Sequence, residues 1–149
     1  MSATCEVIAR GGKLYVFPNC EVQAGAWMTC PPVTVLEQNA GVDAIGGAVM
    51  DALQRFRTNV PLPDDYELAA NQALEGTGFK SWRSFSKGAQ RLGVRSVGAE
   101  ILVTPTVADS RGGYGDLEDK AITVRADPAA IGSAVVDALG KCEFRTRLG

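Results

Sequence analysis

The stretch that decides the fold is AIGGAVMDAL at residues 44–53, because the chain repeats it as AIGSAVVDAL at residues 130–139. Eight of the ten letters are identical, at an offset of 86 residues. In each copy, apolar residues recur at i, i+3, i+4, i+7 and i+8, the period of a helix with one buried face. Two matching amphipathic helices are therefore expected, over about 45–56 and 131–142.

The repetition extends beyond these helices. LYVFP at 14–18 resembles ILVTP at 101–105, at an offset of 87, and RFRT at 55–58 resembles EFRT at 143–146, at an offset of 88. Offsets that drift by single residues indicate loop insertions within one shared layout.

Each half is typical of a strand, a loop, a second strand and a capped helix. Asp127 and Pro128 form an N-cap and a first-turn proline for the second helix, and Asp43 is the expected cap of the first. Glycines in the stripe, Gly46 and Gly132, are expected to let each helix lie close to a sheet. Strands are expected where β-branched and aromatic residues cluster between turn residues, at 6–9, 13–17, 33–36, 100–104 and 121–125.

The predicted fold is α+β, a single domain over residues 1–149. It consists of a largely antiparallel sheet with the two repeated helices packed on it, and its halves are related by an approximate internal two-fold axis.

Composition excludes several classes of function. A hydrophobic content of 46% and a charged content of 21% are ordinary for a soluble globular protein. No apolar run reaches the roughly 18 residues of a membrane span, and the first residues lack the pattern of a signal peptide. We therefore expect a cytoplasmic protein with no membrane contact, whose four cysteines are reduced thiols.

The chain contains no histidine, which removes Ser-His-Asp and Cys-His catalysis and His-ligated metals. The glycines of the repeated phrase do not form a GxGxxG or GxxxxGK[ST] phosphate loop. Cys20 and Cys30 have no histidine to lower a thiol pKa, so structural or incidental thiols are expected. We predict no cofactor and no metal.

Two acidic segments are the candidate sites for contact with a partner. The segment 106–120, TVADSRGGYGDLEDK, is expected to be a long loop, and it contains Asp109, Tyr114, Asp116, Glu118 and Asp119. Its spacing is not that of an EF-hand, and an acidic loop with an aromatic suits docking on a basic protein, although a plain hairpin tip is equally compatible. The second segment, 64–75, coincides with a short helix expected over 65–75 and contains Asp64, Asp65, Glu67 and Glu75. A solvated helix start would also explain Asp64 and Asp65.

A basic stretch occupies residues 79–96. A helix is expected over 81–92, with Arg83, Lys87 and Arg91 on one face and Trp82 and Phe85 interleaved. Such a face could bind nucleic acid, or it could be a solvated surface whose aromatics anchor the helix. The net charge of −2 favours the second interpretation, so no direct nucleic-acid partner is predicted.

Four motifs in a fixed order resemble one known family: GFKSWRSFSKGAQ at 78–90, ILVTP at 101–105, GGYG at 112–115 and DPAAIGSAVVDAL at 127–139. The order is similar to that of the bacterial immunity proteins of contact-dependent growth inhibition (CDI), from about Gly76 to Cys142. The matched positions look like fold determinants rather than contact residues: Trp82, Phe85, Pro105, Asp127, Gly132 and Leu139.

The resemblance implies a small cytoplasmic protein that is not an enzyme. It would bind the C-terminal toxin domain of a CDI effector, commonly an RNA-cleaving nuclease, and occlude its active site. Because such a nuclease has a basic cleft, the acidic segment 109–119 is the first candidate for toxin binding and 64–75 the second. The alternative is a histidine-free small-molecule or nucleic-acid binding protein or enzyme, with Tyr114 and the carboxylate of Asp116 or Glu118 gathered in a concave pocket.

Overall fold

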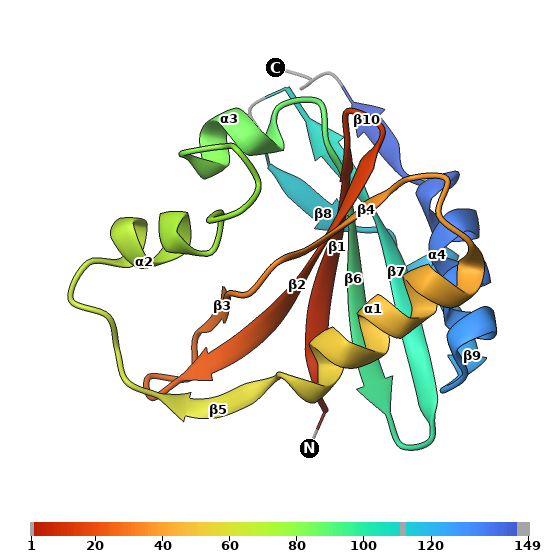
Figure 1. Cartoon of the computed structure of the whole chain (residues 1–149), viewed down its shortest axis with the longest axis horizontal. Coiled ribbons are helices and arrows are strands. Elements are labelled where there is room, and N and C mark those ends of the chain that lie inside the picture. The colour runs from red at the N-terminus through yellow and green to blue at the C-terminus, as the bar shows by residue number, and fades with distance from the viewer. Residues whose placement is uncertain (1, 111–112, 146–149) are drawn as a thin grey trace.

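The computed structural model describes residues 2–110 and 113–145. One curled sheet carries two long helices on one face and a helical insert on the other (Figure 1). The elements in chain order are β1 (Thr4–Arg10), β2 (Lys13–Val22), β3 (Trp27–Thr29), β4 (Thr34–Glu37), α1 (Val42–Gln54), β5 (Arg57–Val60), α2 (Tyr66–Gln72), α3 (Trp82–Ser86), β6 (Gln90–Val97), β7 (Glu100–Asp109), β8 (Tyr114–Asp116), the 3-10 helix η1 (Glu118–Lys120), β9 (Ile122–Arg125), α4 (Pro128–Leu139) and β10 (Glu143–Arg145).

The sheet consists of two halves with the same register. In the first half, β1 and β2 pair antiparallel with Cys5 opposite Pro18, and in the second, β6 and β7 pair with Leu92 opposite Pro105, each residue moved by 87 positions. The later strands repeat too, because β3 and β4 flank β2 as β8 and β9 flank β7. A parallel strand closes each half, β5 on β2 and β10 on β7. The predicted strands are confirmed.

The halves meet at the centre of the sheet, where β1 and β6 pair antiparallel. Glu6 lies opposite Gly93, its own counterpart in the second half at the offset of 87. An approximate two-fold axis therefore passes through this residue pair. The predicted α+β fold and its internal duplication are confirmed.

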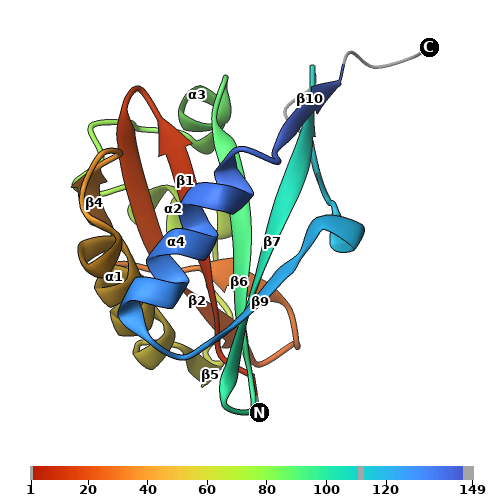
Figure 2. The same cartoon turned by 90° about the vertical axis from the view of Figure 1, so that its right-hand side faces the viewer.

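The helices α1 and α4 lie side by side on one face of the sheet (Figure 2). The repeated apolar stripe faces inward, since Ile45 and Val49 of α1 and Ile131 and Val135 of α4 have no exposed surface. These helices and the sheet strands beneath them form the larger of two hydrophobic cores. In the described part of the chain, no helix has the length and apolar character needed to cross a membrane.

Glycines allow these two helices to touch at the backbone. A Cβ atom added to Gly46 would lie 1.8 Å from the carbonyl oxygen of Pro128, and one added to Gly132 would lie 1.9 Å from that of Val42. The contact is reciprocal, as the internal two-fold requires. The expectation that these glycines bring each helix close to the sheet is therefore wrong, because they bring the helices close to each other.

The two helices begin differently. Asp127 caps α4, and its carboxylate accepts a hydrogen bond of 3.1 Å from the Ala130 amide. The predicted cap at Asp43 is wrong, because the N-cap lies two residues earlier, at Gly41, and makes no side-chain cap bond. Asp43 lies within the first turn instead, where a carboxylate still favours the helix dipole.

The insert between the halves packs on the other face of the sheet. Phe85 of α3 is fully buried, and its ring centroid lies 5.0 Å from that of Tyr15 and 5.9 Å from that of Phe17. Arg10 of β1 makes two contacts with this insert. Its guanidinium lies 4.4 Å from the Phe79 ring centroid, and its Nε donates to the Phe85 carbonyl. The insert thus has a hydrophobic core of its own with β1 and β2.

The predicted helix over 81–92 is wrong in its second half. The helix α3 ends at Ser86, Gly88 adopts a φ of 75°, and strand β6 begins at Gln90. Within β6, residues alternate between the two faces of the sheet, so Arg91 and Arg95 point away from the buried Leu92. No basic helical face with Arg83, Lys87 and Arg91 is formed.

Two of the cysteines differ from expectation. Cys20 of β2 and Cys30 after β3 are joined by a disulfide, with their Cα atoms 6.1 Å apart. The prediction that all four cysteines are reduced thiols is therefore wrong for this pair. Cys5 and Cys142 are free thiols.

The free energy of unfolding is expected to fall as pH rises above about 8.5, the ordinary pKa of a thiol. Burial, and then the neighbouring Glu6 carboxylate, raise the pKa of Cys5, so the unfolded chain loses this proton before the folded one does. This contribution to the free energy of unfolding is fully present at neutral pH. Above about pH 8.5, one such group reduces the free energy of unfolding by at most about 1.4 kcal/mol per pH unit.

Urea unfolding between pH 7 and 10.5 measures this slope, and Cys5→Ala should make it shallower. Part of the slope should persist in the variant, because burial also raises the pKa of Tyr114 and Cys142. An equal slope in the wild type and the variant would contradict the assignment to Cys5.

Candidate functional site

The sheet face opposite α1 and α4 is hollowed over its second half. The insert covers Tyr15 and Phe17, which are 5% and 0% exposed, but it leaves their counterparts at the offset of 87, Leu102 and Thr104, partly open. A cleft of about 700 Å³ lies there, and its lining includes Thr4, Glu6, Asn19, Glu21, Trp27, Arg91, Arg95, Leu102, Thr104, Thr106, Tyr114 and Asp116.

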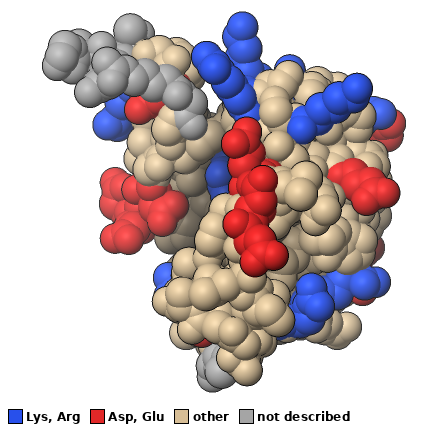
Figure 3. Space-filling model, turned by 90° about the vertical axis from the view of Figure 1, so that its left-hand side faces the viewer, with Lys and Arg blue, Asp and Glu red and all other residues tan. Residues whose placement is uncertain are grey.

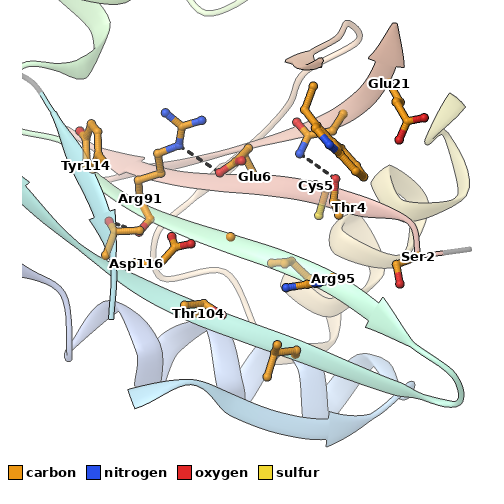
Figure 4. A pocket seen from close by; sticks show the side chains of 16 residues that line it. Ser2, Thr4, Cys5, Glu6, Glu21, Arg91, Arg95, Thr104, Tyr114 and Asp116 are labelled. Atoms are coloured by element: carbon orange, nitrogen blue, oxygen red, sulfur yellow. Dashed lines mark hydrogen bonds and ion pairs between the residues drawn. The ribbon is translucent and has the colours of Figure 1, made fainter. Parts of the chain in front are cut away.

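An ion pair lies across the centre of the cleft floor. The Nε atom of Arg91 donates to the Glu6 carboxylate at 3.0 Å, and the two side chains point toward each other (Figure 4). Burial acts to lower the pKa of Arg91, but the attraction and hydrogen bond of Glu6, with smaller contributions from Tyr114 and Asp116, raise it above its ordinary value. Arg91 is thus a permanent positive charge, and the Glu6 carboxylate compensates it within the floor.

Tyr114 connects β8 to the insert at one end of the cleft. Its hydroxyl oxygen lies 3.1 Å from the carbonyl oxygen of Ser86 and 3.0 Å from that of Ala89, within donating distance of both. Burial raises the pKa of this phenol, although Arg91 opposes the shift. The cleft does bring Tyr114 and Asp116 together, as the enzyme alternative requires, but the hydroxyl is held by backbone carbonyls and is a weaker acid than usual.

The two acidic segments lie on opposite sides of the hollow. Figure 3 shows acidic side chains in a central column over α2 and in a second group at the left edge, with the hollow between them. The α2 group comprises the exposed residues Asp64, Asp65, Glu67 and Glu75. The η1 group comprises the exposed residues Asp116, Glu118 and Asp119.

Two of the predicted contact residues have local structural roles. Asp65 caps α2, since its carboxylate accepts from the Leu68 amide at 3.1 Å. Asp109 lies at the end of β7, where its carboxylate accepts from the Gly113 amide at 2.9 Å and holds the β7–β8 turn. Of the nine predicted contact residues, only Tyr114 and Asp116 line the cleft.

The segment 106–120 is not the long irregular loop that was expected. The strand β7 continues to Asp109, and β8 and η1 follow, so most of the segment is regular structure. The ion pair between Lys120 and Glu143 also fixes η1 to β10. Arg111 and Gly112 of this segment, and Thr146 at the end of the repeated RFRT motif, lie outside the described residues.

A comparison with known protein families identifies the family of this chain. A sequence model of the CdiI family, the CDI immunity proteins, matches residues 61–142. The chain belongs to this family. The matched region extends from the insert through β6 to α4, so it includes about half of the residues that line the cleft and both acidic groups. Because these two groups flank the hollow, they are called the α2 wall and the η1 wall below.

Two solved structures are similar to this CDI immunity protein along almost its full length. A protein of unknown function, NMB0488 from Neisseria meningitidis, superposes with a TM-score of 0.76 and 16% identity, covering 96% of each chain. A chain of the CdiA-CT/CdiI toxin and immunity complex from Yersinia pseudotuberculosis superposes with a TM-score of 0.72 and 15% identity, covering 96% of this chain and 98% of that one. These two likenesses show the shared fold. No curated protein matches the sequence.

Sequence reasoning missed the floor of the cleft in this CDI immunity protein. Glu6 lies far from Arg91 and Arg95 in the sequence, and it shares the floor with them only because β1 pairs with β6. Polar and apolar residues alternate over 90–97, a pattern typical of a strand. The prediction of a helix over 81–92 overlapped this pattern and concealed it. Trp27, which is 52% exposed at the cleft edge, was passed over as the neighbour of two cysteines.

Proposed function

We propose that this CDI immunity protein binds the C-terminal toxin domain of a CDI effector at the open cleft and occludes the toxin's active site. The observation that carries the proposal is the half of the sheet that the insert leaves uncovered, flanked by two acidic groups. The chain acts by binding and contributes no catalytic step, and the position of the Tyr114 hydroxyl on backbone carbonyls supports this role.

The acidic walls favour a toxin that cleaves RNA. Such an enzyme holds phosphates in a basic cleft, and carboxylates placed on an inhibitor can accelerate association with that cleft and occupy phosphate positions. The net charge of the whole chain is only −2, so the complementarity is local to the α2 and η1 groups.

The proposed compartment is the cytoplasm, and the Cys20–Cys30 disulfide is one of several links within the β2–β3 hairpin. The hairpin is also held by backbone hydrogen bonds, which the Val22 amide donates to the Ala26 carbonyl and the Cys30 amide donates to the Pro18 carbonyl. Binding therefore does not depend on the disulfide in this proposal.

Co-expression with CDI toxin domains from the same genome, beginning with any that is encoded immediately upstream, tests the proposal. Cells that express the toxin domain alone should stop growing, and co-expression of this chain should restore growth and yield a complex that co-purifies. The purified complex should show no RNA cleavage above that of a toxin-free control. Growth arrest that persists despite soluble immunity protein would refute it.

Reversing the acidic walls is expected to slow association with the toxin domain by about tenfold or more at low salt. Suitable double variants are Asp64→Lys with Glu67→Lys on the α2 wall, and Glu118→Lys with Asp119→Lys on the η1 wall. Stopped-flow association rates between 50 and 500 mM salt measure the effect, which should shrink as salt screens the charges. The control is Asp137→Lys on the exposed face of α4, and an equal loss in this control would contradict a local effect.

A further inference from the structure

The covered half of the sheet shows how a side chain occupies this surface. There, the Phe85 ring packs over Tyr15 and Phe17, and Ile8 of β1 lies in the same cluster. The internal two-fold moves these three floor positions by 87 residues onto Leu102, Thr104 and Arg95. We call Leu102, Thr104 and Arg95 the open subsite, and all three line the cleft.

The open subsite has room for a ring. Its floor is a leucine and a threonine where the covered half has a tyrosine and a phenylalanine, so the side chains fill less of the space above the strands. Leu102 and Thr104 are partly exposed, and Arg95 is exposed. Among the described residues Arg95 has no carboxylate within ion-pair distance, so its guanidinium is available to a ligand.

We propose that an aromatic side chain of the toxin domain occupies the open subsite, on Leu102 and Thr104 and beside Arg95, as Phe85 occupies the covered half. This inference rests on the proposed function and specifies the contact at its centre. The insert is thus an intramolecular counterpart of the toxin segment, docked on the symmetry-related face.

The chemistry of the subsite favours an aromatic occupant. A ring gains apolar contact with Leu102 and a cation–π contact with a guanidinium, as Phe79 does with Arg10 at 4.4 Å in the covered half. Buried aromatic anchors surrounded by a polar rim are also the usual centre of a protein interface. The surrounding walls carry the α2 and η1 acidic groups, so the aromatic is expected within a basic segment of the toxin domain.

Filling the open subsite tests the inference. Thr104→Arg is expected to raise the Kd for the toxin domain identified by co-expression by about 30-fold or more, the usual size of a central contact. Arg95→Ala should raise it by several-fold, in line with the loss of one cation–π contact. The control is Val136→Arg on the exposed face of α4, which should bind like the wild type. Urea unfolding of each variant separates loss of binding from loss of fold.

A double-mutant cycle identifies the occupant. Alanine variants of the toxin domain's aromatic residues are each combined with Leu102→Ala, and one of them should couple to Leu102 by at least about fivefold in Kd. No coupling with any aromatic residue would overturn the inference about the occupant.

The outcomes also separate the inference from the function on which it rests. If Thr104→Arg binds like the wild type while reversal of the acidic walls weakens binding, the open subsite is refuted and toxin binding stands. If the wild-type chain does not bind the toxin domain, both fail.

Discussion

Gly46→Ala is expected to lower the free energy of unfolding by about 3 kcal/mol or more, the upper range for overpacking a close-packed core. The added Cβ would lie 1.8 Å from the Pro128 carbonyl oxygen and 2.5 Å from its carbonyl carbon. Both atoms belong to the backbone of α4, so no side-chain rotation can relieve the overlap. The helices must separate, which loosens the larger hydrophobic core between them.

Gly132→Ala should have the same effect, because the two-fold places its Cβ 1.9 Å from the Val42 carbonyl oxygen. The matched control is Gly47→Ala, one residue along α1, where an added Cβ meets nothing within 4 Å. That variant should gain up to about 1 kcal/mol from helix propensity. Urea unfolding of the three variants gives the comparison, and a Gly46→Ala protein as stable as Gly47→Ala would refute the backbone contact.

Phe85→Ala is expected to cost about 3–5 kcal/mol, the range for removing a fully buried phenylalanine. The ring packs with four other aromatic side chains, so its loss leaves a cavity at the centre of the smaller core. The insert depends on this core, since Phe85 and the Arg10 contacts are, with the Tyr114 hydroxyl, among its attachments to the sheet. We therefore expect the insert to open before the rest of the protein.

Hydrogen exchange followed by mass spectrometry measures this opening. Amides of residues 66–86 should lose protection in Phe85→Ala, while those of α1 and α4 keep theirs. Leu68→Ala is the control, because Leu68 of α2 is 57% exposed and its truncation should change stability by less than about 0.5 kcal/mol. Uniform loss of protection over the whole chain would show that the insert has no separate stability.

The fold could be predicted from the sequence because the same order of strands and helix occurs in both halves of the chain. The apolar period over 45–56 and 131–142 gave both long helices, and matching strands at 13–17 and 100–104 gave the symmetric sheet. The error over 81–92 arose because three basic residues at helical spacing, Arg83, Lys87 and Arg91, concealed the period-two pattern of Leu92 and Val94. A positive φ at Gly88 separates helix from strand there, and its effect is not visible in hydrophobic periodicity.

The cleft could be predicted only in part. Acidic residues of both walls were identified by their local charge, because charge clusters are visible in a single segment. The floor requires knowledge of strand pairing, since Glu6 meets Arg91 only across 85 positions of sequence. The disulfide between Cys20 and Cys30 likewise follows from the β2–β3 register and not from cysteine spacing.

The two-fold axis at Glu6 and Gly93 has a consequence for how this protein can change over evolutionary time. The internal duplication provides two equivalent surfaces on the sheet. The insert covers one of them and forms a hydrophobic core with it. Substitutions under Phe85 are constrained by the fold, whereas the corresponding positions in the second half, Leu102 and Thr104, are free of that constraint. A new partner can therefore be accommodated by changing one copy while the other preserves the architecture.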